Sequence, residues 1–295
     1  MNALRAATLG VVDVDATAAR YARCFDYAVV ERGTISAALA GLWHTPALAG
    51  RQQVVMRPAS GADVFIRLVQ AAQAPGYRPL RTHGWAALEL CVQDVLAMHE
   101  RLRGGPFDII GPPRAVSGLP SIHPMQVQGP DAEIVYLTEI KQGGPRSGLP
   151  TARSPVDTLF IIVAGCSDMP ASARWFEHQL GLNIAPEVEI PYRMLARAFE
   201  LPPTQLHRLT TASFDGDICL ELDQYPAAAE PRVGLPGELP PGISLCTFAL
   251  PSLDRVHGPW LSPPERHDGA VYRGARAGSL MGPDGLLVEL VELAL

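Results

Sequence analysis

The sequence lacks the features that mark disulfide-bonded, zinc-binding or membrane-spanning proteins. Its five cysteines are widely spaced and lie mostly in apolar runs, with no CxxC pair. That pattern is typical of buried thiols in a reducing compartment, not of a disulfide framework or a zinc knuckle. No apolar run approaches the length of about 18 residues that suggests a membrane span, and the start does not read as a signal peptide. We therefore expect a soluble, cytoplasmic protein.

Charged residues are also few. They make up 18% of the chain, and 24 Lys and Arg stand against 30 Asp and Glu, for a net charge of −6. This balance argues against a nucleic-acid or anionic-membrane partner. Hydrophobic residues account for 47% of the 295 positions, which predicts a large buried interior and about two domains. The expected partner is a small molecule.

The chain does contain one order of elements several times over. Near its start, a β-like run at 6–13 leads into a helical stretch that Asp15 is placed to cap, and strands follow at 27–31, 53–57 and 64–70. The same order, β-α-β-β-β, returns from residue 86, from residue 157 and from residue 242. Four repeats of about 70 residues are the clearest organisational signal in the sequence.

The helices of the repeats differ in how well they are specified. Asp94 precedes one helix, and Ser167 or Asp168 precedes another, which carries Pro170 in its first turn and ends at Gly181. In the fourth repeat, prolines and a glycine after residue 250 leave room for only about one turn. We expect that repeat to lack a regular helix.

Two repeats close on a related turn and strand. The turns begin at Gly129-Pro-Asp and Gly282-Pro-Asp-Gly, where Pro presets φ and the final Gly of the second turn accepts a positive φ. In the strand after the second turn, Glu289 shares a face with Leu287. Tyr136 stands at the matching position of the earlier copy.

A polar segment rich in Gly, Pro and Ser divides the chain. We expect a linker at 141–156 between one pair of modules at 1–140 and a second pair at 157–295. Each half also carries an extra helix between its second and third strands, at 35–43 and 192–201.

This arrangement resembles the vicinal oxygen chelate superfamily, which includes glyoxalases, bleomycin-resistance proteins and extradiol dioxygenases. The resemblance rests on the run from Val11 to Tyr21, Asp94 after its strand, the helix from Asp168 to Phe176 and the Gly-Pro-Asp turns. It implies an α+β fold in which four βαβββ modules pair into two domains, each a curved mixed sheet that forms a cup. It also implies a divalent metal held by side chains of the first and last strands of a cup.

The positions that hold this metal in the family contain no histidine here. Carried over, the first-strand and last-strand positions fall on Ala6, Ala87, Thr158, Ser244, Arg67, Tyr136, Glu221 and Glu289. An extradiol dioxygenase needs two histidines and a glutamate, so the sequence contradicts that activity. We expect no metal site, and the alternative is a divalent cation held by Glu221 and Glu289 through oxygens and waters.

The ionisable side chains at these positions suggest acid/base chemistry. If Glu221 and Glu289 face each other across a C-terminal cup, they share a proton and the pKa of one rises. In an N-terminal cup, strand parity turns Glu89 inward, where Arg67, Glu89 and Tyr136 could hold a carboxylate or enolate. Each set also has a structural interpretation, namely a solvated glutamate or a buried Arg67–Glu89 ion pair that only rigidifies its cup.

The candidates for substrate binding are mostly aromatic residues and histidines near the cups. The two extra helices carry large apolar side chains and either cover a cup mouth, form a homodimer contact or belong to the core. For a single histidine a structural role is the commoner one. The candidates are Trp85, His44, His123, Trp43 and Phe199.

The leading hypothesis is a metal-independent isomerase or lyase that acts by general acid/base catalysis on a small, largely apolar oxygenated metabolite. Its candidate catalytic residues are Glu289, Glu221, Tyr136, Glu89 and Arg67. One alternative is a non-catalytic small-molecule binding protein of the bleomycin-resistance kind. The other is a divalent-metal enzyme with only glutamate ligands.

Overall fold

Two mixed β-sheets form the body of the protein. The computed structural model describes residues 3–116, 118–141 and 148–293. Within these residues one sheet has eight strands and the other has nine. The α+β fold with four paired modules, each forming half of a sheet, is confirmed.

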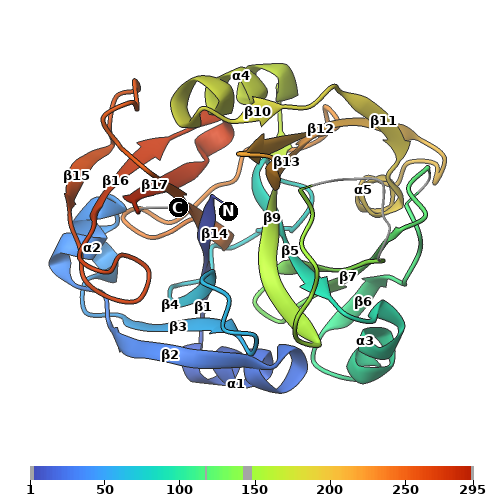
Figure 1. Cartoon of the computed structure of the whole chain (residues 1–295), viewed down its shortest axis with the longest axis horizontal. Coiled ribbons are helices and arrows are strands. Elements are labelled where there is room, and N and C mark those ends of the chain that lie inside the picture. The colour runs from blue at the N-terminus through green and yellow to red at the C-terminus, as the bar shows by residue number, and fades with distance from the viewer. Residues whose placement is uncertain (1–2, 117, 142–147, 294–295) are drawn as a thin grey trace.

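The eight-stranded sheet is built by the first and fourth modules, which are the blue and red elements in Figure 1. The first module contains β1 (Leu4–Val11), α1 (Val14–Phe25), β2 (Tyr27–Thr34), α2 (Ala37–Leu42), a 3-10 turn (Pro46–Leu48), β3 (Gln52–Pro58) and β4 (Phe65–Gln70). The fourth contains β14 (Gly242–Leu250), β15 (Ser262–Arg266), β16 (Arg276–Met281), a 3-10 turn (Pro283–Gly285) and β17 (Leu287–Glu292). As expected, the described residues of the fourth module include no α-helix.

The nine-stranded sheet is built by the second and third modules, in green and yellow (Figure 1). The second module contains β5 (Gly84–Val92), α3 (Val95–Leu102), β6 (Asp108–Gly111), β7 (Ile122–Gln128) and β8 (Ile134–Ile140). The third contains β9 (Val156–Cys166), α4 (Met169–Leu180), β10 (Asn183–Ile184), β11 (Val188–Pro191), α5 (Arg193–Ala198), β12 (Leu206–Phe214) and β13 (Asp217–Gln224). The two extra helices, α2 and α5, lie where the sequence predicts them.

The partners of the modules differ from the sequence prediction. We expected 1–140 and 157–295 each to close a cup of its own, but β1 pairs with β14 and β5 pairs with β9, both antiparallel. Each cup therefore combines one module from either side of the 141–156 segment, of which residues 142–147 lie outside the described part. The repeat pattern identifies modules but carries no information about which strand edges meet, and the prediction assumed that neighbours in sequence pair.

Aspartates begin the three long helices. Asp13, Asp94 and Asp168 each lie just before a helix and accept a hydrogen bond from a first-turn backbone N–H. Asp15, the predicted cap of α1, lies inside the first turn and pairs with Arg32 instead. Each of these aspartates follows the last residue of its module's first strand by two positions, so it marks an equivalent point in three modules.

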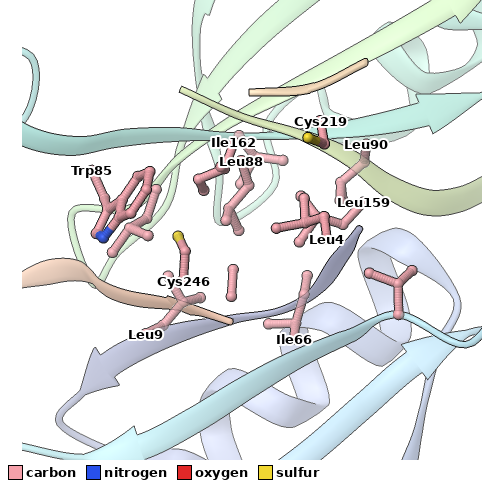
Figure 2. Close-up of a cluster of buried hydrophobic side chains, with 14 of the residues drawn as sticks. Leu4, Leu9, Ile66, Trp85, Leu88, Leu90, Leu159, Ile162, Cys219 and Cys246 are labelled. Atoms are coloured by element: carbon pink, nitrogen blue, oxygen red, sulfur yellow. The ribbon is translucent and has the colours of Figure 1, made fainter. Parts of the chain in front are cut away.

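The backs of the two sheets pack against each other. Figure 2 shows Leu88, Leu90, Leu159 and Ile162 of one sheet lying across from Leu4 and other side chains of the second sheet. Separate apolar clusters line the inner faces of the two cups. This sandwich holds the cups facing away from each other, so each builds its own site.

Two further predictions from composition concern the cysteine side chains and membrane-spanning helices. All five cysteines are free and buried, as their apolar settings predict. Among the described residues, no helix is long and apolar enough to cross a membrane.

Candidate functional site

Strand register places four residue pairs at equivalent positions in the two cups. In each pair a residue of the module's first strand lies beside one of its last strand. The pairs are Thr8 with Arg67, Thr247 with Glu289, Glu89 with Tyr136, and Val163 with Glu221. The predicted last-strand positions are therefore equivalent, but the first and fourth modules share one cup, and the second and third share the other.

Two first-strand positions were assigned wrongly. Counted back from the capping aspartates, the position of Ala6 before Asp13 recurs at Ala87 before Asp94 and at Ile161 before Asp168, not at Thr158. In the fourth module, Leu245 takes the place assigned to Ser244. The long, uniformly apolar runs of these strands hid their register from the sequence analysis.

Side chains fill the cup of the first and fourth modules. Glu289 is fully buried, and its Oε2 accepts hydrogen bonds from Thr247 Oγ1 at 2.5 Å and from Arg67 Nη2 at 3.0 Å. Its Oε1 accepts from Trp43 Nε1 and Tyr272 Oη, each at 2.7 Å. Burial acts to raise the pKa of Glu289, but the charge of Arg67 and these donors hold that pKa below its ordinary value. The carboxylate is thus held ionised.

Arg67 is satisfied in the same network. Its Nη1 donates to Tyr272 Oη at 2.6 Å and its Nε to Thr8 Oγ1 at 2.9 Å, while the guanidinium lies 4.4 Å from the centre of the Trp43 ring. The predicted Arg67–Glu89 pair does not form, since Arg67 pairs with Glu289. Nor do Glu221 and Glu289 face each other, because they lie on different sheets. Trp43 belongs to this buried network and not to a cup mouth.

The cup of the second and third modules encloses an open cavity of about 520 Å³. Glu89, Tyr136 and Glu221, three of the five predicted catalytic residues, line it together. Most of the remaining wall is apolar, contributed by Val116, Leu119, Ile122, Pro124, Ile140, Leu149, Phe160, Ile161, Ala185, Pro186, Val188, Ile190, Leu209 and Ile218. Its size and apolar lining suit a small organic ligand.

A cluster of hydroxyl and carboxyl groups lies on one side of this cavity. The Oη atoms of Tyr136 and Tyr192 are 2.6 Å apart, and Tyr192 Oη donates to Glu221 Oε1 at 3.4 Å. Thr138 Oγ1 donates to Glu89 Oε1 at 2.6 Å. Two phenols and two carboxyl groups therefore meet in an otherwise apolar pocket.

Two buried carboxyl groups beside Glu221, those of Glu89 and Asp223, have raised pKa values. Burial and the nearby charge of Glu221 raise the pKa of Glu89 to about 8. Burial, the charge of Glu221 and a hydrogen bond to it raise the pKa of Asp223 far above its ordinary value. Near neutral pH, Glu89 is thus mainly protonated, and the pKa of Asp223 is shifted in the same direction.

The sequence analysis missed Asp223 and Tyr192. Asp223 follows Glu221 by two positions on β13, so the alternation of strand side chains places both on one face, a signal that was available. Tyr192 precedes α5 and carries no periodic signal. Only the folding of the α5 segment over the sheet brings its hydroxyl to Tyr136.

None of the five predicted substrate-binding residues is among the described residues that line the cavity, and Trp43 belongs to the network of the other cup. Phe199 packs against Tyr225, and Trp85 donates through Nε1 to the Leu287 carbonyl of the other sheet. An irregularity in β5 pairing after Trp85 breaks the parity that was used to turn it inward. His44 is exposed at the end of α2, and His123 lies between cavity residues Ile122 and Pro124, hence on the opposite face of β7.

The donor groups do not fit the divalent metal that the family resemblance implies. In the filled cup, both oxygens of Glu289 already accept hydrogen bonds from four side chains, one of them the Arg67 guanidinium. In the open cup, Glu221 shares the metal positions with Ala87, Tyr136 and Ile161, which supply neither a second carboxylate nor an imidazole. Among the described residues, no group of three or more His, Cys, Asp or Glu side chains is arranged to hold a metal ion. The alternative of a cation between Glu221 and Glu289 is wrong, because they lie on different sheets.

Comparison with known proteins identifies the fold. No family model and no curated protein matches this sequence significantly. Glyoxalase I from Zea mays superimposes with a TM-score of 0.65 at 16% identity, over 99% of this chain and 92% of that one. A single-substitution variant of that enzyme gives 0.67 at 16% identity, with the same coverage of 99% and 92%.

A more distant structure gives the same result. A proposed dioxygenase from Bacillus subtilis superimposes with a TM-score of 0.62 at 12% identity, over 98% of this chain and 84% of that one. At such low identity these likenesses establish the fold alone. The chain therefore has the fold of the vicinal oxygen chelate superfamily, as its four repeated modules indicate.

Proposed function

We propose that the cavity of the second and third modules is the active site of a metal-independent isomerase or lyase for a small, largely apolar oxygenated metabolite. The observation that carries this proposal is the placement of Glu89, Glu221, Tyr136 and Tyr192 together on the wall of an apolar cavity of about 520 Å³. Ionisable groups buried in such a setting are common at catalytic sites.

The carboxyl groups divide into a base and acids. Burial and the charge of Glu221 raise the pKa of both Glu89 and Asp223, and we assign the protons to these two and the role of carboxylate base to Glu221. Glu221 takes a proton from the carbon next to a substrate carbonyl. The electron pair of the broken C–H bond moves onto the carbonyl oxygen and forms an enolate.

The tyrosines stabilise that enolate. Tyr136 and Tyr192 present their hydroxyls at one place, 2.6 Å apart, and burial raises the pKa of each phenol well above its ordinary value. The phenols therefore remain protonated. While Tyr192 donates to Glu221, the hydroxyl of Tyr136 turns from Tyr192 to the substrate and donates a hydrogen bond to the developing oxyanion.

Glu89 completes the reaction as the acid. With a pKa of about 8 it holds a proton near neutral pH. Transfer of this proton to a different substrate carbon completes an isomerisation, whereas transfer to a departing hydroxyl completes an elimination of water, the reaction of a lyase. A proton passed from Glu221 to Glu89, which interact electrostatically, then restores the starting state.

Deuterium exchange tests this proposal without knowledge of the natural substrate. Acetylnaphthalene is a neutral, enolisable ketone, and proton NMR in D₂O follows the loss of its methyl signal. We expect the protein to accelerate this exchange and Glu221→Gln to lower the rate roughly a hundredfold or more. Glu189→Gln is the matched control, since Glu189 is exposed on β11 between the cavity residues Val188 and Ile190.

Two outcomes would contradict the proposal. Complete loss of exchange on treatment with a chelator would show that a metal is required. Binding of the ketone without any protein-dependent exchange would instead identify a non-catalytic small-molecule binding protein.

A further inference from the structure

The Gly-Pro-Asp turn at 129–133 joins β7 to β8 and also contacts the other sheet. Asp131 Oδ1 accepts a hydrogen bond from the backbone N–H of Val12 at 3.4 Å. Its Oδ2 accepts from Thr17 Oγ1 at 2.7 Å and forms an ion pair with Arg20. Thr17 and Arg20 belong to α1, and Val12 lies just before that helix. This turn, which we call the first clasp, therefore ties the nine-stranded sheet to a module of the eight-stranded sheet.

The Gly-Pro-Asp turn at 282–286 makes the reciprocal contact. It joins β16 to β17 of the eight-stranded sheet, and Asp284 Oδ2 accepts from the backbone N–H of Ser167 at 2.9 Å. Ser167 directly precedes the aspartate that begins α4, just as Val12 precedes the aspartate that begins α1. This turn, the second clasp, thus ties the two sheets together at the equivalent point of another module.

The two clasps differ at their last residue. The backbone N–H of Gly129 donates to the carbonyl of Glu133, and that of Gly282 donates to the carbonyl of Leu286, each at 2.8 Å. Glu133 and Leu286 therefore close equivalent turns, and both are only 1% exposed. Leu286 packs into the apolar core, whereas Glu133 brings a carboxyl group to the same place. A clasp of this kind thus closes without a carboxyl group.

The carboxyl group of Glu133 is only partly satisfied. Its Oε2 accepts from the backbone N–H of Asp131 at 3.0 Å, but its Oε1 has no hydrogen-bond partner among the described residues. The group also lies so close to Gly129 that a Cβ at this position would clash with it. Loss of the proton from Glu133 would leave a buried, incompletely hydrogen-bonded charge beside the Asp131 carboxylate, which disfavours the closed turn.

We propose that the first clasp is a proton-linked contact between the two sheets. It holds α1 most firmly in mildly acidic solution, when Glu133 is protonated, and it opens more readily as the pH rises and the proton is lost. The second clasp, with Leu286 at this position, lacks this response. The inference concerns neither cup and does not depend on the proposed function.

The groups around Glu133 set the pH range of this response. Burial raises the pKa of Glu133 to about 7, and the charge of Asp131 acts in the same direction. Arg20 and the backbone N–H groups of Glu133 and Asp131 act against the shift. On α1, burial and then the charge of Glu133 raise the pKa of Tyr21 well above its ordinary value, so this phenol stays neutral.

The sign of the response follows from that shift. An opened turn exposes Glu133 to water, where its pKa returns to the ordinary value of 4.5. The closed turn therefore binds the proton more tightly than the opened one. Its extra stability is fully present below pH 4.5 and is lost as the pH rises to about 7.

Hydrogen exchange measured by mass spectrometry tests the proposal, with the second clasp as an internal control. Protection of the backbone amides is compared at pH 5 and pH 8 after division by the intrinsic exchange rates. We expect protection at 129–133 to fall roughly fiftyfold between these pH values, and protection at 282–286 to fall much less. Glu133→Gln keeps the shape of the side chain but cannot ionise, so it should abolish the difference between the clasps.

Glu133→Leu copies Leu286 and provides a second variant that cannot ionise. Equal protection of the first clasp at pH 5 and pH 8 in the parent protein overturns the proposal. So does an equal fall at both clasps, because it reports unfolding of the whole protein. A fall at 129–133 that persists in both variants would assign the proton to another group and overturn it as well.

Discussion

The two cups share one framework but differ in what stands at the same register positions. In the cup of the first and fourth modules, Arg67 and Glu289 have opposite charges and form a buried ion pair at 3.0 Å. In the cup of the second and third modules, Tyr136 and Glu221 take those places beside a cavity of about 520 Å³. One cup is filled by its own side chains, and the other remains open.

This difference follows from how a buried carboxylate is stabilised. Glu289 receives hydrogen bonds from four side chains, including a guanidinium, so it is ionised without a ligand. Glu89 receives one from Thr138 and lies near Glu221, so it keeps its proton up to about pH 8. A fully satisfied network favours stability, whereas a carboxyl group that can gain or lose a proton favours chemistry.

The largest expected effect comes from breaking the filled cup. Arg67→Met leaves Glu289 buried without its countercharge and should lower the free energy of unfolding by roughly 3–5 kcal/mol. Urea denaturation at neutral pH measures the change. The double variant Arg67→Met with Glu289→Met should recover much of the loss, and a double variant as unstable as the single one would refute this account.

The pH dependence of stability should have opposite signs in the two cups. The pKa of Glu89 is raised in the folded state, so the folded chain binds more protons and the contribution of Glu89 to stability is lost between pH 4.5 and about pH 8. We compare the free energy of unfolding of Glu89→Gln with that of the parent protein. This difference should shift in favour of the variant by roughly 2–4 kcal/mol when the pH rises from about 5 to about 9. Thermal denaturation at both pH values measures the gain.

Glu289 provides the contrast to that measurement. Its pKa is lowered in the folded state, so its contribution is present above the unfolded pKa of 4.5 and is lost as the pH falls through the lower, folded pKa. Glu289→Gln should therefore destabilise the protein most near neutral pH and less in acid. If the unfolding free energies of both variants, relative to the parent protein, changed with pH in the same direction, the distinction between the cups would be refuted.

A smaller effect concerns the rate of deuterium exchange. If Glu89 is the acid, the rate should fall about tenfold for each pH unit above its pKa of about 8. Glu89→Gln should abolish this decline while lowering the plateau. A decline that persists in the variant would assign the proton to another group.

The smallest expected effect comes from one donor to Glu289. Trp43→Phe removes the 2.7 Å hydrogen bond to Oε1 but leaves Arg67, Thr247 and Tyr272 in place. We expect a loss of about 1–2 kcal/mol in unfolding free energy and no change in ketone binding by the other cup. Weaker ketone binding in this variant would show that the two cups are coupled.

The sequence by itself determined the repeated units. The aspartate that begins each of the three long helices, the Gly-Pro-Asp turns and the alternation of strand side chains are local features, so the fold and the equivalence of Arg67, Tyr136, Glu221 and Glu289 could be predicted. The same alternation would have revealed Asp223 beside Glu221.

Only the tertiary structure decided which modules share a cup. Arg67 and Glu289 meet because β1 pairs with β14, an arrangement that depends on strand edges and on the packing of the sheet backs. The same pairing separates Glu221 from Glu289 and brings Tyr192 to Tyr136 in the other cup. Local patterns fix the modules, but contacts between distant segments fix which cup is filled and which is open.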